Sequence, residues 1–143
     1  MTLNLGEMAD NAVPVATLVE GEEAQVEITK VDNQLDNQEK PYLMLTLSNL
    51  DLDGNYADIR EFVDTGERTP PFVKNEADER KWRNTLATKM KAFFESFDIQ
   101  DEDRNIPETW EGKTGTIIAK VKDDAKYGLS NNVKRYVGTP DGA

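Results

Sequence analysis

The chain contains neither cysteine nor histidine among its 143 residues. Without cysteine there is no disulfide, no thiolate metal ligand and no thiol nucleophile. Without histidine the chain lacks the commonest general base near neutral pH and the commonest ligand for transition metals. Ser-His-Asp hydrolysis, Cys-His chemistry and ordinary zinc sites are therefore excluded. We expect a protein that is not an enzyme and that holds no cofactor and no metal.

Long apolar runs are also missing. No stretch approaches the roughly 18 apolar residues that a transmembrane helix needs, so no membrane partner is expected. The first ten residues show no basic region ahead of an apolar one, and we therefore expect no secretory signal. Together with the absence of cysteine, these features predict a cytoplasmic protein.

Charge is present in excess but is unevenly distributed. The net charge is −11, with −14 in residues 1–111 and +3 in residues 112–143. A positive segment in a chain that otherwise repels polyanions indicates a local anion site, for which nucleic acid is the leading candidate. The basic residues of this segment are Lys113, Lys120, Lys122, Lys126, Lys134 and Arg135.

Alternation of apolar and polar side chains predicts five strands. Between the second and third strands, Asp53-Gly54-Asn55 is typical of a hairpin turn, because these residues adopt positive φ at little cost. Residues 32–40 are polar and are expected to form a long loop. The predicted strands lie within residues 24–29, 42–50, 56–64, 117–122 and 127–137.

One amphipathic helix is predicted from the N-cap residue Asn75 to about Phe97. Its apolar face is formed by Trp82, Leu86, Met90, Phe93 and Phe97. The order of three strands, a helix and two strands predicts a mainly β fold. It fits a five-stranded Greek-key barrel with one helix between strands 3 and 4, as in the OB-fold. An open antiparallel sheet packed on one helix is the alternative.

The length is sufficient for one domain with a single hydrophobic core. We expect an N-terminal arm at residues 1–19, the domain at residues 20–138 and a flexible tail at residues 139–143. The sequence leaves the oligomeric state open.

Several segments, in this order, resemble phage-encoded OB-fold proteins that bind single-stranded DNA. They are residues 20–30 (EGEEAQVEITK), 42–47 (YLMLTL), 90–95 (MKAFFE), 111–113 (EGK) and 132–136 (NVKRY). The resemblance covers residues 18–138. It implies sequence-tolerant, non-catalytic binding of single-stranded DNA in phage DNA replication or recombination, in the host cytoplasm. Replication or recombination proteins are further expected partners, although the chain ends without the acidic, aromatic-tipped tail that recruits them in many bacterial-type single-strand binders.

The basic segment and nearby aromatic residues supply the predicted contacts. With a strict two-residue period, Lys120 and Lys122 share one face of their strand. Lys134 and Arg135 are expected on opposite faces, with Tyr136 on the same face as Lys134. In an OB-fold, cations follow the nucleic-acid backbone and aromatic rings stack on bases. The predicted nucleic-acid-binding residues are Tyr42, Lys120, Lys122, Lys126, Tyr127, Lys134, Arg135 and Tyr136.

The same residues have structural interpretations that the sequence leaves open. Lysines on an exposed strand also solubilise a sheet edge. Tyr42 and Tyr56 are equally consistent with packing beneath the helix or the arm, and Phe62 and Phe72 are expected in the core. The cations around the third strand are expected on a solvated face, because nearby acids dilute them. These cations are Arg60, Arg68 and Lys74.

Two other functions remain as rivals. The first is an acidic protein–protein adaptor or accessory module without nucleic-acid binding, which would use the acidic residues 100–111. The second is a nuclease that depends on magnesium, which would need several carboxylates converging on one point. The sequence alone does not show where such carboxylates would meet.

Overall fold

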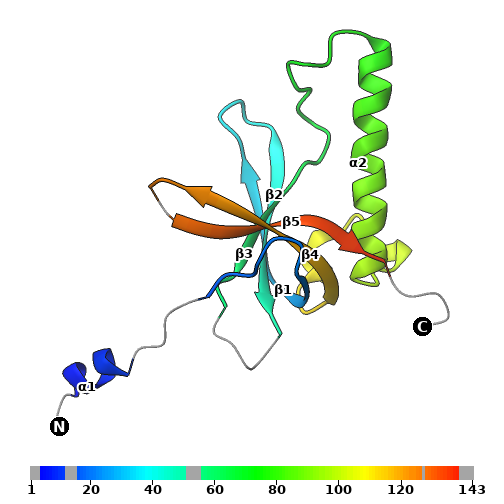
Figure 1. Ribbon diagram of the computed structural model, residues 1–143. Coiled ribbons are helices and arrows are strands. Elements are labelled where there is room, and N and C mark those ends of the chain that lie inside the picture. The colour runs from blue at the N-terminus through cyan, green and yellow to red at the C-terminus, as the bar shows by residue number, and fades with distance from the viewer. Residues whose placement is uncertain (1–3, 12–15, 51–55, 127, 139–143) are drawn as a thin grey trace.

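Five strands form one antiparallel sheet, and one long helix packs against it (Figure 1). The computed structural model describes residues 4–11, 16–50, 56–126 and 128–138. The strands are β1 (Glu23–Leu35), β2 (Pro41–Asn49), β3 (Ile59–Val63), β4 (Thr114–Asp124) and β5 (Gly128–Val137). The helices are α1 (Leu5–Asp10) and α2 (Glu76–Ser96), with short 3-10 helices η1 (Asp101–Asp103) and η2 (Pro107–Trp110). The predicted mainly β class is confirmed.

Within the sheet the strand order is β3-β2-β1-β4-β5, and α2 connects β3 to β4. The two edge strands, β3 and β5, contact one another. No backbone ladder joins them in the part of the chain described, so the sheet is not closed into the expected barrel. A side chain bridges the edges instead, because the Glu61 carboxylate accepts a hydrogen bond from the Val133 N–H at 3.2 Å.

Strand lengths differ from the sequence-based prediction. β1 runs through the polar stretch as far as Leu35, which pairs with Pro41, so the loop between β1 and β2 is reduced to residues 36–40. Backbone pairing with β2 carries the strand on, since a ladder of N–H···O=C bonds does not require apolar side chains. β3 is shorter than predicted and begins at Ile59. The predicted turn at 53–55 lies outside the described residues.

The core forms where the inner face of the sheet meets α2. Leu45, Leu47 and Ile117 are fully buried, and Phe93 of α2 is 1% exposed. The Phe93 ring is the centre of an aromatic cluster, with centroid distances of 5.0 Å to Phe97, 5.2 Å to Trp110 and 5.2 Å to Tyr136. Burial of each such ring stabilises the fold by about 1.5–3 kcal/mol. This cluster holds α2 against β5.

The helix begins where the sequence predicts. The Asn75 side chain accepts a hydrogen bond from the Asp78 N–H at 2.9 Å, and acidic residues occupy the first turn. Trp82, Phe93 and Phe97 from the predicted apolar face are buried. The predicted amphipathic helix is therefore confirmed.

The N-terminal segment is only partly a free arm. α1 buries none of its residues. Leu18, in contrast, is 4% exposed, and its N–H and C=O bond the Asn131 side chain at 2.7 and 3.0 Å. Ala16 forms a parallel bridge with Tyr56. The body of the protein therefore begins before residue 20. The predicted tail at 139–143 lies outside the described residues, and no described helix has the length and apolarity to span a membrane.

The C-terminal end of α2 lies against the backbone of β4. The Ser96 hydroxyl donates to the Thr116 carbonyl at 2.8 Å and accepts from the Thr116 N–H at 3.1 Å. A Cβ atom at Gly115 would lie 2.8 Å from the Ser96 carbonyl oxygen and 2.9 Å from the Phe97 ring. Only glycine permits this approach without displacement of the helix.

We therefore expect Gly115→Ala to lower the free energy of unfolding by about 1–3 kcal/mol, the usual cost of overpacking. Urea denaturation monitored by circular dichroism measures the change. Gly6→Ala is the matched control, because a Cβ at Gly6 meets nothing within 4 Å. Equal stability of the two variants would contradict the close approach of α2 to β4.

Candidate nucleic-acid interface

Two aromatic rings lie side by side on the outer face of β2 and β3. The inward positions of β2 are leucines, so Tyr42 and Met44 face outward, and Met44 pairs with Phe62 across the ladder. The ring centroids of Tyr42 and Phe62 are 5.0 Å apart, with the planes inclined at 36°. Phe62 is 48% exposed. The face thus presents apolar ring surface to solvent, next to the exposed Arg60.

This position of Phe62 corrects the prediction that Phe62 and Phe72 lie in the core, since Phe72 is also exposed, at 64%. The inward residues of β3 are Ile59, Glu61 and Val63. Glu61 occupies an inward position because its carboxylate finds partners there, and the strict alternation of a strand then turns Phe62 outward. The prediction placed Phe62 on the wrong face of the strand because it considered only that the side chain is apolar.

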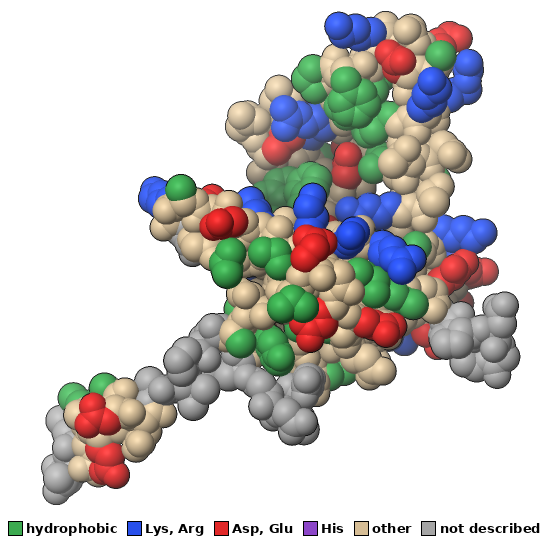
Figure 2. Space-filling view, in the orientation of Figure 1, with side chains coloured by type: hydrophobic (Ala, Val, Ile, Leu, Met, Phe, Trp, Pro, Cys, Tyr) green, Lys and Arg blue, Asp and Glu red, His purple; other side chains and the backbone are tan. Residues whose placement is uncertain are grey.

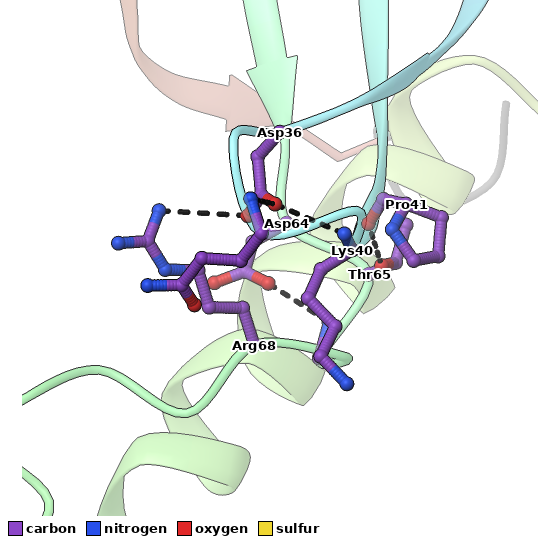
Figure 3. Close-up of polar contacts among 8 residues, drawn as sticks. Asp36, Lys40, Pro41, Asp64, Thr65 and Arg68 are labelled. Atoms are coloured by element: carbon purple, nitrogen blue, oxygen red, sulfur yellow. Dashed lines mark hydrogen bonds and ion pairs between the residues drawn. The ribbon is translucent and has the colours of Figure 1, made fainter.

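The loop between β1 and β2, beside the aromatic pair, is held by Asp36 (Figure 3). One carboxylate oxygen of Asp36 accepts from the N–H groups of Gln38 and Lys40 at 2.8 and 2.9 Å. The other oxygen lies 3.5 Å from the Arg68 guanidinium. The Lys40 N–H is the largest cause of the lowered pKa of Asp36, and the Gln38 N–H and Arg68 act in the same direction. Asp36 is therefore ionised at neutral pH, and both of its carboxylate oxygens are occupied by contacts with the loop and with Arg68.

The segment after β3 lies next to the same loop. The Thr65 hydroxyl donates to the Pro41 carbonyl at 2.7 Å, and Asp64 Oδ1 accepts from the Gly66 N–H at 2.8 Å. Between the two loops lies a pocket of about 230 Å³. We call it the aromatic pocket. Its lining includes Asp36, Tyr42, Phe62, Asp64, Arg68 and Pro70.

A second pocket, of about 450 Å³, lies between α2 and β5. Lys89 from α2 and Lys134 and Arg135 from β5 line it, and Figure 2 shows Lys and Arg side chains gathered where β5 passes α2. A smaller pocket between the two shares Phe62 with the aromatic pocket, and Lys89 and Tyr136 with the α2–β5 pocket. The three pockets are therefore neighbours on the surface, and we call them together the groove, with aromatic rings lining one end and cations the other.

A bulge in β5 brings two of these cations to the surface together. Val133 and Arg135 pair with successive residues of β4, which leaves Lys134 as an extra residue. Lys134 and Arg135 are both exposed, and the next residue, Tyr136, returns to the interior. The predictions that Lys134 and Arg135 face opposite ways, and that Lys134 shares a face with Tyr136, were wrong. They assumed an unbroken two-residue period.

Tyr136 is a core residue and not a surface stacking platform. It is 7% exposed, and its ring meets those of Phe93 and Phe97 edge-on. Burial, and to a lesser extent the charge of Glu61, raise the pKa of the Tyr136 hydroxyl well above its ordinary value. Its predicted role in base stacking is therefore corrected: Tyr136 supports the floor of the groove and offers no free ring face.

Glu61 lies beneath the groove and is 7% exposed. In addition to accepting from Val133, its carboxylate lies 3.5 Å from Lys89 Nζ. Burial is the largest influence on its pKa and raises it, while Lys89 and the Val133 N–H oppose the rise. Glu61 thus joins β3, β5 and α2 through one buried carboxylate, and it offsets part of the charge that Lys89 brings to the groove.

The other predicted contacts lie on the β4–β5 hairpin, outside the groove. Lys120 and Lys122 are exposed on one face of β4, and Lys126 is exposed in the turn that follows. Tyr127 lies outside the described residues. Glu20 lies near both sets of cations. Its carboxylate is 3.5 Å from Nζ of Lys134, which lines the groove. The Val121 N–H is the largest cause of the lowered pKa of Glu20, and both Lys134 and the hairpin residue Lys120 contribute.

Sequence reasoning missed two residues that line the groove, Phe62 and Lys89. Counting alternate residues from Ile59 would have placed Phe62 outward with Arg60. No signal in the sequence marks Lys89, because its place depends on how α2 lies across β5. Among the described residues, no group of three or more acidic side chains is placed to hold a metal ion.

Comparison with protein-family models finds none that matches the chain, and comparison with curated proteins finds none with significant similarity.

The buried carboxylate generates a prediction about pH. Because the folded-state pKa of Glu61 is raised, its stabilising effect is complete below the pKa of an unfolded glutamate, about 4.3, and is lost as pH rises through the folded-state pKa. Glu61→Gln keeps an acceptor for Val133 and removes the titration. We expect the stability of this variant, relative to the natural protein, to increase with pH.

Urea denaturation of both proteins between about pH 4 and about pH 8 measures this difference. Glu108→Gln, which makes the same substitution at an exposed position, is the control. A difference for Glu61→Gln that does not change with pH would contradict the raised pKa.

Proposed function

We propose that this protein binds single-stranded DNA without catalysis and with broad sequence tolerance. Bases stack on the Tyr42–Phe62 pair, and the phosphate backbone follows the groove toward Lys134 and Arg135. The observation that carries the proposal is the exposed aromatic pair at one end of a groove whose other end is lined by cations. This is the combination by which proteins bind single strands without reading their sequence.

The aromatic pair supplies the base-binding half of the site. Every base has a π-face, so a partly exposed ring accepts any of them, with about 1–3 kcal/mol for each stacked base. Phe62 offers more free ring surface than Tyr42, because it is nearly half exposed while Tyr42 is partly buried. Two adjacent rings suit two successive bases, or one base held over both.

The α2–β5 pocket supplies the backbone-binding half. Three cations line it, and none of the described residues that line it is acidic. Lys89 is partly offset by Glu61, and Lys134 by Glu20, whereas Arg135 forms none of the ion pairs found among the described residues. The net charge of −11 opposes DNA at long range. Binding therefore depends on these local contacts and should weaken steeply with salt.

The arrangement of elements supports the same function. A five-stranded antiparallel sheet with its helix between β3 and β4 is the order of the OB-fold, in which the face of strands 2 and 3 and the loops 1–2 and 4–5 bind oligonucleotides. Tyr42 and Phe62 lie on that face, and Lys126 lies in the loop between β4 and β5. On this view, Lys120 and Lys122 extend the phosphate track along the hairpin.

The biological setting belongs to the proposal as well. The resemblance of the ordered motifs to phage-encoded single-strand binders supports a role in phage DNA replication or recombination in the host cytoplasm. Replication or recombination proteins would then be further partners.

Titration of the protein into a fluorescent oligo-dT of about 30 nucleotides at low salt tests the proposal. We expect anisotropy to rise, and Phe62→Ala to weaken binding by about tenfold through the loss of one stacking ring. Phe72→Ala is the matched control, because Phe72 is an exposed ring that does not line the groove. No anisotropy change at tens of micromolar protein would reject DNA binding and favour the adaptor function.

Charge variants separate the groove from the hairpin. If the phosphate backbone of the DNA lies in the groove, the double variant Lys134→Ala/Arg135→Ala should weaken DNA binding more than Lys120→Ala/Lys122→Ala. Each phosphate contact that is lost should also reduce the salt dependence by about 0.7 log units per decade of salt. If Lys120→Ala/Lys122→Ala weakened binding more than Lys134→Ala/Arg135→Ala, the DNA would be bound along the β4–β5 hairpin and not in the groove.

A further inference from the structure

The aromatic pocket has a polar lining unlike that of the rest of the groove. It contains two carboxylates, Asp36 and Asp64, and one guanidinium, Arg68 (Figure 3). The two acids outweigh the single cation, so a phosphate is repelled here, whereas the α2–β5 pocket attracts it. An uncharged base is not repelled in this way. The aromatic rings and the two carboxylates that line the pocket together favour binding of a base over binding of a phosphate.

The two carboxylates are not equivalent. Both oxygens of Asp36 are engaged, one by two N–H groups of the loop and the other by Arg68. Asp64 uses Oδ1 for the Gly66 N–H, and its Oδ2 makes none of the hydrogen bonds or ion pairs found among the described residues. An ionised carboxylate only accepts hydrogen bonds. Asp64 therefore offers acceptor capacity beside the aromatic rings.

Arg68 offers the complementary donors. Its Nη1 lies 3.5 Å from Asp36, a long contact that occupies one corner of the guanidinium. The side chain is 48% exposed. A guanidinium carries five N–H donors in a planar fork, so other donors remain for a ligand in the pocket. The lining of the pocket thus combines a carboxylate acceptor, guanidinium donors and aromatic rings.

The four bases differ in how well they match this combination. Guanine presents two neighbouring N–H donors, on N1 and N2, with the O6 acceptor next to them. Thymine presents a single N–H between two carbonyl oxygens, and those oxygens would be repelled by a carboxylate. Adenine and cytosine each present one amino group. Guanine alone offers both N–H groups of a bidentate contact to one carboxylate together with an acceptor for an arginine.

From this match we infer that the aromatic pocket prefers guanine over thymine, with the base stacked on Tyr42 and Phe62, its N1–H and N2–H donated to Asp64 and its O6 accepting from Arg68. The inference rests on the proposed binding of single-stranded DNA and adds specificity at one position of the strand. The remaining nucleotides along the groove are held by stacking and charge, which do not distinguish sequence.

The test compares two labelled oligonucleotides of about 15 nucleotides, oligo-dT and the same strand with one central dG, by anisotropy. A single guanine avoids the self-association of guanine runs. We expect the guanine-containing strand to bind the natural protein about tenfold more tightly, as a bidentate base contact allows. Strands with a central dA or dC should fall between the two.

The variant Asp64→Asn then tests whether Asp64 is the residue that recognises guanine. Asparagine keeps an oxygen that accepts from the Gly66 N–H, so the turn is preserved. It replaces the other carboxylate oxygen by an amino group, which is a hydrogen-bond donor and cannot accept from the N–H groups of guanine. We expect the ratio of dG to dT affinities to fall close to one, while oligo-dT still binds. Asp101→Asn, on the exposed η1 turn, makes the same charge change outside the pocket and should keep the full ratio.

The outcomes are distinct. Equal affinity of the natural protein for both strands would overturn the guanine preference while leaving DNA binding intact. The same would follow if Asp64→Asn kept the full preference. If neither strand bound, the proposed function itself would fail.

Discussion

The arrangement of the whole site depends on the buried carboxylate of Glu61. It lies at an inward position of β3, accepts a hydrogen bond from Val133 of β5 and contacts Lys89 of α2. A buried charge is tolerated only when it has such partners. Glu61 lies inward together with Ile59 and Val63, and the alternation of the strand then turns Phe62 to solvent beside Tyr42. One buried carboxylate therefore links the two edge strands and contacts the helix, on the same strand that carries the exposed Phe62.

The second constraint is electrostatic. The molecule is acidic, so a surface that binds anions must gather its cations locally. The bulge in β5 does this by bringing Lys134 and Arg135 to the surface together, where α2 adds Lys89. At the other end of the groove two carboxylates outnumber the single cation Arg68, so under the proposed function the phosphates and a base would bind at different ends. The two ends of one groove thus have different chemistry.

Much of the architecture was predictable from local patterns. The cap at Asn75 and the apolar face that includes Phe93 located α2, and the alternation of side chains located the five strands, because both signals act over a few neighbouring residues. Less of the site was predictable. Tyr136 was misassigned because its burial against Phe93 follows from long-range packing, and Lys134 because a bulge interrupts the two-residue period. Lys120 and Lys122 kept their predicted common face, since β4 is regular there.

By itself, the sequence determined the mainly β class, the order of the elements, the long helix and the concentration of positive charge near the C-terminus, because these follow from composition and local periodicity. Only the tertiary structure decided which cations and rings meet. Lys89 lines one pocket with Phe62 and another with Arg135, although the three residues are far apart in the sequence, because α2 packs across β5 and the two edge strands of the sheet come into contact. Local patterns give the side of a strand on which a residue lies, but the neighbour that it faces is decided by packing between distant segments.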